Sequence, residues 1–437
     1  MRFLAALACA LLVSAPALAQ GANGQAATQQ QTISDVAAAQ LLVANNRLDD
    51  ARKLLEYILS SRPEDRDALF LLGNVAVAQN KYDEAVSLFR RLLVLEPDAE
   101  RVRLELARAF FLKGDYQNAD RQFRFARAGD IPDAAKENID HFLGAISRLR
   151  EWTFDFALGL APDTNQNAAT SASQVQIFGL PFTLDPNARS QSGVGLAGSA
   201  DGEWSSLVSD NIKARIGAGI SRIEYSGGKF DDMTVSGYAG PQFLYPDWDF
   251  SLLATGFQRW YGNKSFVSGI GGKLAGEYGI TSNLLAAGSV GIQAVTDRFT
   301  PEQSGTLYTT QAQAAYVLSP SSLAQLQLGF NRQDAKIGAY SYSGLWVSAA
   351  YQRDLPVGFS ASLQPAWFVT RYDEALAAFG KKRADDTLML NLTLLNRRLD
   401  YHGFTPRFSY TFTDQHSNLA LYSYTRHQFQ IGLTSQF

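Results

Sequence analysis

The sequence has very little of the residues that usually carry redox, metal and nucleophilic chemistry. Its 437 residues include a single cysteine, Cys9, which leaves no partner for an internal disulfide. The four histidines are scattered, with no spacing typical of a metal site or of a Ser-His-Asp triad. They are His141, His402, His416 and His427. We therefore expect a protein that is not an enzyme and that holds no metal and no cofactor.

Long apolar runs and a strong excess of one charge are also missing. The formal net charge is −3 and no long basic run occurs, which disfavours a nucleic-acid partner. After the N-terminus, no uninterrupted apolar stretch approaches the roughly 20 residues that a membrane-spanning helix needs. If the protein crosses a membrane, helices are not the elements that the sequence favours for it.

The N-terminus has the pattern of a secretory signal peptide. Arg2 precedes an apolar stretch from Phe3 to Val13, and the small residues Ala17 and Ala19 follow, in the spacing of a signal-peptidase site. The apolar stretch is too short to span a bilayer, so we predict cleavage before Gln20 rather than a membrane anchor. Residues 1–19 are therefore predicted to be a signal peptide, and residues 20–31 a flexible leader.

The composition changes near residue 150, and the part before it is a repeat. Small and bulky residues recur at a spacing of 34 residues, which is the tetratricopeptide period. The recurring residues are Ala51, Ala85 and Ala119, and Leu55, Phe89 and Phe123. A further apolar-faced helix is expected over residues 133–149. We predict a helical solenoid over residues 32–150, in which stacking of repeats buries a core that one repeat could not.

A solenoid of this kind presents a concave groove, formed by the first helix of each repeat. The positions expected to line it carry a mixture of apolar and polar side chains. They are Gln40, Phe70, Asn74, Leu104, Arg108 and Phe111. We interpret the groove as a candidate binding site for a peptide or protein. The alternative is a spacer that only positions the second domain.

From residue 151 onward, the helical period is replaced by alternation of apolar and polar residues. Within "EWTFDFALGLAPD", for example, Trp152, Phe154 and Leu158 alternate with Thr153 and Asp155. A period of two with one apolar face indicates half-buried strands. The runs are about 10 to 15 residues long, which is longer than most strands of soluble sheets. Strands of that length with polar small residues on one face are typical of a transmembrane barrel with a wet interior.

We count fourteen strands over residues 151–437 and predict an antiparallel barrel. Twelve or sixteen strands are the alternatives, because residues 233–261 alternate poorly. Lys213 and Arg215 are expected to face the interior, as are Lys273, Glu277 and Arg371. Asp163 and Asn165 begin a long predicted loop, residues 163–192. That loop is interpreted as a client contact or interior plug, the alternative being simple turn formation.

The last residues, "RHQFQIGLTSQF", form the clearest alternating run of the chain. We predict that this strand pairs with the first one near residues 152–160 and closes the barrel, which removes both sheet edges. Phe429, Ile431, Leu433 and Phe437 should then face lipid. Ending on Phe437 is a feature in which outer membrane barrels resemble one another, so this residue is also interpreted as an insertion signal.

The order of the two domains resembles the surface lipoprotein assembly modulator (Slam) family, also called type XI secretion translocons. The segments that show the resemblance are "WTFDFALGLAPDTNQNAAT", "IFGLPFTLDPNARSQSGVGL" and the aromatic C-terminus. The resemblance implies a periplasmic tetratricopeptide domain (residues 32–150) followed by a fourteen-stranded outer membrane barrel (residues 151–437).

By that resemblance, the barrel would move a client protein to the cell surface, after the repeats receive it. The implied partners are a surface lipoprotein or a soluble haem- or metal-scavenging protein, outer membrane lipids, the barrel assembly machinery and periplasmic chaperones. The alternative function is an exopolysaccharide export porin with a periplasmic repeat scaffold. A passive porin is also considered, although it would leave the repeats unexplained.

Overall fold

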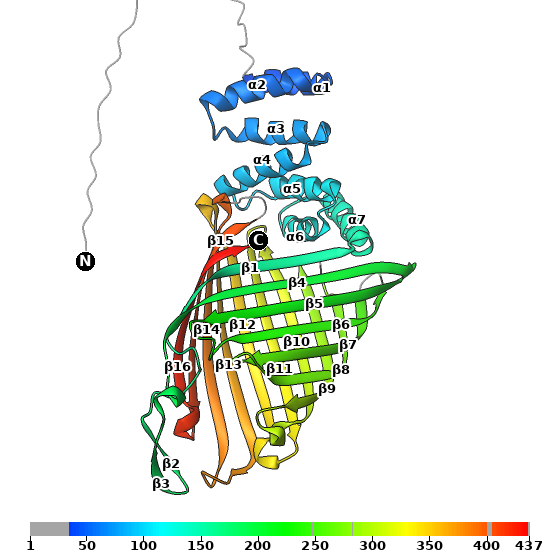
Figure 1. Ribbon diagram of the computed structural model, residues 1–437. Coiled ribbons are helices and arrows are strands. Elements are labelled where there is room, and N and C mark those ends of the chain that lie inside the picture. The colour runs from blue at the N-terminus through cyan, green and yellow to red at the C-terminus, as the bar shows by residue number, and fades with distance from the viewer. Residues whose placement is uncertain (1–34, 246–247, 282, 400–403, 436–437) are drawn as a thin grey trace, which may run out of the picture.

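The computed structural model describes residues 35–245, 248–281, 283–399 and 404–435. In Figure 1, these residues form a stack of helices over one end of a closed β-barrel. We call this end the repeat end, and the opposite one the loop end. The predicted signal peptide and leader (residues 1–31) and Phe437 lie outside the described residues. None of the helices in the described ranges is both long enough and apolar enough to cross a membrane.

Seven helices form the stack, and successive helices pack as antiparallel pairs. They are α1 (Asp35–Ala44), α2 (Leu48–Ser61), α3 (Arg66–Ala78), α4 (Tyr82–Leu95), α5 (Glu100–Lys113), α6 (Tyr116–Arg127) and α7 (Asp133–Leu149). Aspartates begin two of them: the side chains of Asp65 and Asp115 accept hydrogen bonds from the backbone of Ala68 and Asn118. These caps satisfy helix N–H groups that have no partner within the helix.

The repeat period determines the helical core. Ala51, Ala85 and Ala119 are fully buried, and their small side chains let neighbouring helices approach closely. The bulky residues of the same period, Phe89 and Phe123, are also fully buried and fill the space between repeats. One continuous apolar core therefore runs from α1 to α7. The predicted solenoid is confirmed.

Fourteen strands form the barrel, as predicted. They are β1 (Trp152–Asp163), β4 (Gly193–Ser209), β5 (Ile212–Tyr225), β6 (Asp232–Leu244), β7 (Trp248–Tyr261), β8 (Lys264–Gly279), β9 (Leu284–Asp297), β10 (Gly305–Ser319), β11 (Ser322–Ala335), β12 (Tyr342–Asp354), β13 (Phe359–Leu376), β14 (Lys381–Asn396), β15 (Thr405–Ser417) and β16 (Tyr424–Thr434). Each pairs antiparallel with its neighbours, and β1 closes the barrel against β16. The weakly alternating segment forms two separate strands, β6 and β7.

The alternation of the sequence separates an apolar outside from a polar inside. On β1, Leu158 and Leu160 point outward and are about half exposed, and their partners on β16 are Leu433 and Ile431. Small residues such as Gly159 point inward. An apolar band of this kind is what a barrel presents to lipid. The expected pairing of the last strand with the first is therefore seen, with Ile431 and Leu433 on the outer face.

The predicted loop of residues 163–192 contains an element that periodicity did not reveal. Its strands β2 (Gln174–Ile177) and β3 (Leu180–Thr183) form a separate hairpin that projects from the loop end of the barrel (Figure 1). Each strand has only four residues, too few for an alternating pattern to stand out. The expectation of a loop without strands was therefore wrong for these residues.

Gly73 offers a test of the repeat packing. An ideal Cβ at this position would lie 2.6 Å from Cε1 of Phe89. Glycine to alanine normally stabilises a helix interior by about 1 kcal/mol, but here the clash should outweigh it and cost about 1–3 kcal/mol. Thermal loss of helical circular dichroism in the detergent-solubilised chain measures this. Gly144→Ala is the matched control, since a Cβ added to Gly144 on α7 would meet nothing within 4 Å. Equal melting of both variants would contradict the packing described.

Candidate functional site: the barrel interior and its two ends

The repeat stack is fixed to the barrel by a buried arginine. Arg103 lies on α5 and is only 1% exposed. Its Nη2 donates to Oδ2 of Asp354 at 2.8 Å and to the carbonyl of Pro97 at 2.9 Å, and its Nη1 donates to Oε1 of Gln122 at 2.9 Å. Burial lowers the pKa of the Arg103 guanidinium, and Asp354 opposes this by stabilising the charged form. An arginine stays charged under such conditions, so the contact is a buried ion pair.

Asp354 receives a second cation from the barrel itself. It is the last residue of β12, and Arg397 of the turn after β14 donates to Oδ2 at 2.9 Å, while the Ser360 hydroxyl donates to Oδ1 at 2.5 Å. One buried carboxylate thus lies between a guanidinium of the repeats and a guanidinium of the barrel. Because a buried charge without a partner is costly, each of these groups favours the docked arrangement.

Two further contacts join the helices to the rim of the barrel. Gln117 on α6 donates to Asp155 of β1 at 3.1 Å and accepts from the backbone N–H of Phe154. Asp98, between α4 and α5, accepts from Ser321 in the turn between β10 and β11 at 2.5 Å. The short connection between β10 and β11 therefore lies at the repeat end and contacts the helices.

Lys213 and Arg215 of β5 both face the interior, as expected, but they have different surroundings. Lys213 is buried, and its Nζ donates to the carbonyls of Ser147 and Arg150 at 2.9 and 2.7 Å. These carbonyls lie at the C-terminal end of α7, where a cation is favoured. Lys213 therefore holds α7 in the barrel mouth. Arg215 instead pairs with Glu203 at 2.6 Å within the interior.

A cavity of about 360 Å³ lies below α6 and α7, inside the barrel mouth. Its lining is strongly polar and includes charges of both signs. The charged residues are Asp120, Arg124, Arg150, Glu203, Lys213, Arg215, Asp249, Lys273 and Glu277. Lys273 and Glu277 are thus interior residues, as predicted. The prediction for Arg371 was wrong: it shares the outer face of β13 with the exposed Trp367, because the two positions are four residues apart on one strand.

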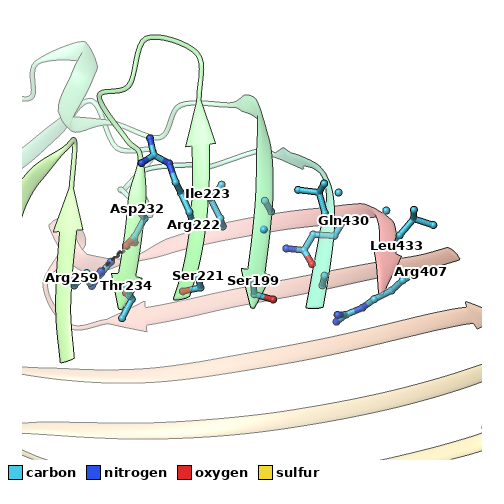
Figure 2. A pocket seen from close by; sticks show the side chains of 16 residues that line it. Ser199, Ser221, Arg222, Ile223, Asp232, Thr234, Arg259, Arg407, Gln430 and Leu433 are labelled. Atoms are coloured by element: carbon cyan, nitrogen blue, oxygen red, sulfur yellow. Dashed lines mark hydrogen bonds and ion pairs between the residues drawn. The ribbon is translucent and has the colours of Figure 1, made fainter. Parts of the chain in front are cut away.

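A second cavity, of about 490 Å³, lies against the inner face of the β1–β16 seam (Figure 2). Gln430 and Arg407 line it on the β15–β16 side, while Asp232 and Arg259, which pair at 2.6 Å, line the other side. Between them the wall is made of small residues such as Ser199.

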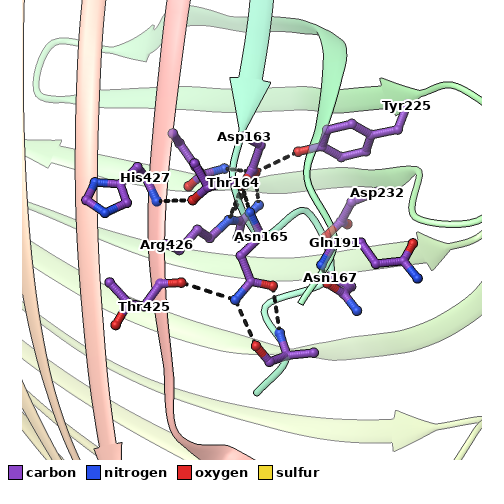
Figure 3. Close-up of polar contacts among 12 residues, drawn as sticks. Asp163, Thr164, Asn165, Asn167, Gln191, Tyr225, Asp232, Thr425, Arg426 and His427 are labelled. Atoms are coloured by element: carbon purple, nitrogen blue, oxygen red, sulfur yellow. Dashed lines mark hydrogen bonds and ion pairs between the residues drawn. The ribbon is translucent and has the colours of Figure 1, made fainter. Parts of the chain in front are cut away.

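Asp163 forms the centre of a polar network at the loop end of that seam (Figure 3). Its side chain is fully buried and receives Arg426 at 2.6 Å and Gln428 at 3.0 Å from β16, and the hydroxyl of Tyr225 at 2.9 Å from β5. The backbone N–H of Asn165 also donates to it at 2.8 Å. One carboxylate therefore links the first strand, the last strand and β5.

Asn165 continues this network into the following loop. Its Nδ2 donates to the carbonyls of Ala169 and Thr425, at 2.8 and 3.2 Å, and its Oδ1 accepts from the Ala169 N–H. Asp163 and Asn165 are thus buried in contacts that hold the loop to β16. Neither presents a surface to the interior, which agrees better with the turn-forming alternative than with a direct client contact.

The predicted groove residues lie on the first helices of the three repeats. Gln40 is on α1 and exposed, Phe70 and Asn74 are on α3, and Arg108 and Phe111 are on α5. The two aromatic residues are already engaged by the protein. The guanidinium of Arg101 lies 5.0 Å from the ring of Phe70, and the ring of Phe142 on α7 lies 4.9 Å from that of Phe111. Leu104 is half-buried on α5.

Sequence reasoning missed the residues that hold the ends of the barrel: Arg103, Asp354 and Arg397 at one end, Tyr225 and Arg426 at the other. Arg103 had a signal, because it stands between apolar positions on the buried side of α5. Its partner Asp354, 251 residues later, stands in no sequence pattern that indicates this role. Within the described ranges, no group of three His, Cys, Asp or Glu side chains is placed to hold a metal ion.

The fold defines a class: a transmembrane β-barrel of fourteen strands that carries a tetratricopeptide domain on one end, consistent with an outer membrane location. Two comparisons with known proteins are more specific. Residues 36–100 and 70–124 match tetratricopeptide repeat models, and residues 152–437, the whole barrel, match the model of the surface lipoprotein assembly modifiers. The chain belongs to the surface lipoprotein assembly modifier family.

Curated relatives match over nearly the full chain. A surface lipoprotein assembly modifier of Moraxella catarrhalis is 24% identical over 406 residues, covering 90% of this chain and 78% of the relative. Surface lipoprotein assembly modifier 1 of Neisseria meningitidis serogroup B is 23% identical over 415 residues, covering 90% of this chain and 81% of the relative. The resemblance inferred from the sequence is thereby confirmed.

The buried ion cluster at the repeat end predicts an order of effects. Asp354→Asn leaves Arg103 and Arg397 without their carboxylate and should cost about 3–5 kcal/mol. Arg103→Met should cost less, because Asp354 keeps Arg397. Limited proteolysis of the helices in the detergent-solubilised chain would measure both. Asp83→Asn, which removes an exposed pair with Lys113, is the control and should change little. A reversed order for the two buried variants would contradict the assignment.

The seam network predicts a loss of barrel stability. Asp163→Asn removes the charge that Arg426 needs and should lower the temperature at which the barrel unfolds in SDS by about 5–10 °C. Gel mobility of heated and unheated samples reports this transition. Asp414→Asn is the control, since its partner His416 is largely exposed. No difference between the two variants would show that Asp163 does not secure the seam.

Proposed function

We propose that this protein moves a client lipoprotein across the outer membrane to the cell surface, with the repeats in the periplasm receiving the client and the barrel conducting it. The observation that carries the proposal is the position of the repeat stack, which the buried Arg103–Asp354 pair holds on the mouth of a polar barrel. The chain also belongs to the surface lipoprotein assembly modifier family. A passive pore would have no use for such a domain at its entrance.

The connections between strands support the proposed orientation. Bacterial outer membrane barrels have short periplasmic turns and longer loops outside. The short turns at residues 320–321 and 355–358 lie next to the helices, while the long segment 164–192 lies at the other end. These connection lengths support an orientation with the repeats in the periplasm and the loop end at the cell surface.

The strand number indicates the state of the client in transit. Fourteen strands about 4.8 Å apart and tilted by about 40° enclose a barrel roughly 28 Å across between backbones, and inward side chains narrow it further, whereas a small folded domain is about 30 Å across. We infer that the client passes as an extended chain. Because α6 and α7 lie across the mouth, held by Gln117 and Lys213, these helices must shift when a client enters.

The proposal also assigns partners by location. The apolar outer rows contact outer membrane lipids, and the barrel assembly machinery would insert the barrel, with Phe437 as the signal that we predict. Periplasmic chaperones would deliver the client to the repeats. A soluble secreted protein, such as a haem or metal scavenger, is the alternative client.

The test is co-expression with a candidate lipoprotein encoded beside the gene, followed by protease treatment of intact cells. The lipoprotein should be degraded only when this protein is present and functional. A chain lacking residues 32–149 should still form a heat-modifiable barrel but deliver little client. If the lipoprotein reaches the surface equally well without the protein, the proposed function fails.

A further inference from the structure

The hairpin β2–β3 exposes three large apolar side chains at the end of the barrel farthest from the repeats. Phe178, Leu180 and Phe182 are 74%, 69% and 54% exposed. The base of the hairpin is well packed, since Val175 and Leu184 are buried. The exposure is therefore confined to the tip and one strand of an otherwise ordered element.

The turn at the tip has an unfavourable residue. Phe178 and Gly179 have φ values of 51° and 75°, so both central residues of this two-residue turn are left-handed. Turns of this type favour Asn-Gly, because a bulky side chain at positive φ costs about 1 kcal/mol or more. A phenylalanine here makes the hairpin less stable than asparagine would, and it places an aromatic ring at the outermost point.

Lipid does not account for this exposure, because the outer face of the barrel becomes charged well before the tip. On β13 and β14, the exposed Trp367 and Leu388 are paired, and Asp386 occupies the next outward position of β14, opposite Val369. Arg371, one outward position further along β13, bonds Asp386 at 2.9 Å. This change from apolar to charged residues marks the edge of the hydrocarbon layer.

The tip lies far beyond that edge. The backbone N–H of Phe178 donates to the carbonyl of Ala378, in the loop joining β13 and β14, at 2.7 Å. The five positions from Asp386 to Lys381, at about 3.3 Å each, span about 17 Å of strand, or about 13 Å of height at a tilt near 40°. The apolar surface therefore faces water or protein rather than lipid.

Two further features restrict the kind of protein contact. Pro181 lies on the outer edge of β3 opposite Gln176, where it removes a backbone donor and disfavours the addition of another strand. The loop carrying the hairpin is held beside the seam by Asn165, through Thr425 of β16. A partner would therefore meet the side chains of Phe178, Leu180 and Phe182 at the rim of the barrel exit.

We propose that this hairpin surface, Phe178 with Leu180 and Phe182, binds apolar side chains of the client as its unfolded chain leaves the barrel. The inference rests on the proposed function, which places the loop end at the cell surface. An extended client exposes its future core until it folds, and an apolar surface at the exit would hold such segments away from other chains. Aromatic side chains contribute much of the binding energy at protein surfaces of this kind.

The test uses Phe178→Asn, which removes the ring and relieves the left-handed strain. This variant should unfold at the same or a higher temperature than the wild type, so any loss of function is not a loss of folding. Ile337→Asn, in the loop between β11 and β12, replaces another exposed apolar residue at the same end and is the matched control.

Binding is measured on the purified full-length protein with a defined probe, reduced and carboxymethylated α-lactalbumin, against the native folded form. We expect the unfolded probe to bind at least about fivefold more weakly to Phe178→Asn, with Ile337→Asn unchanged and the folded form unbound. Equal binding by Phe178→Asn and wild type would overturn the inference. Preferential binding of the wild type to protein-free lipid vesicles would also overturn it and indicate a lipid anchor.

The same variants in cells separate this inference from the proposed function. In the co-expression assay, Phe178→Asn should lower the folded client at the surface while Ile337→Asn should not. If wild type and Phe178→Asn deliver equal amounts, the hairpin inference fails and the translocation proposal stands. If the wild type delivers none, the proposed function itself fails.

Discussion

The requirement that every backbone polar group be hydrogen-bonded within lipid governs this structure. A sheet in a bilayer has no water to satisfy an open edge, so the first and last strands must meet. The chain meets this requirement with β1 and β16, whose registered pairs run from Ala157 with Thr434 to Asp163 with Gln428. The other features follow from it, since side chains must alternate between lipid and interior on all fourteen strands.

The two ends of the barrel use buried carboxylates in a similar way. Asp163 joins three strands at the loop end, and Asp354 joins repeats and barrel at the repeat end. Asp163 receives one arginine and several neutral hydrogen-bond donors, and Asp354 receives two arginines and the Ser360 hydroxyl. A buried ion pair adds little stability over a well-packed apolar contact, but it strongly penalises arrangements that separate the charges. Such pairs therefore specify how elements distant in the sequence are positioned relative to each other.

The fold was largely predictable because both periods can be found in the linear sequence without knowledge of tertiary contacts. The 34-residue step locates the helical repeats, and the alternation of two locates the strands to within a few positions. The weakly alternating residues around 245 were harder, since the apolar Leu244 lies on the polar inner face beside Gln242, while the stacked rings of Phe243 and Phe250 lie on the outer face. The hairpin β2–β3 was missed because four-residue strands carry almost no periodic signal.

The site was much less predictable, for a physical reason. Lys213 and Arg215 were correctly placed inside the barrel, but only the tertiary structure shows that Lys213 meets the end of α7. Arg103 and Asp354 belong to different domains, and neither has a local pattern that identifies the other. The aromatic groove residues were assigned by repeat position, yet Phe111 packs against Phe142 because the capping helix returns over α5.

The connection between α7 and β1 has a mechanical consequence. The helix ends at Leu149 and the strand begins at Trp152, so only Arg150 and Glu151 separate them. A domain on a long tether could swing freely, but two residues leave almost no slack. Any force that pulls the helices away from the mouth is transmitted along the chain into β1, one of the two strands that meet at the seam. The repeat stack is thus mechanically coupled to the barrel at β1, where the barrel closes.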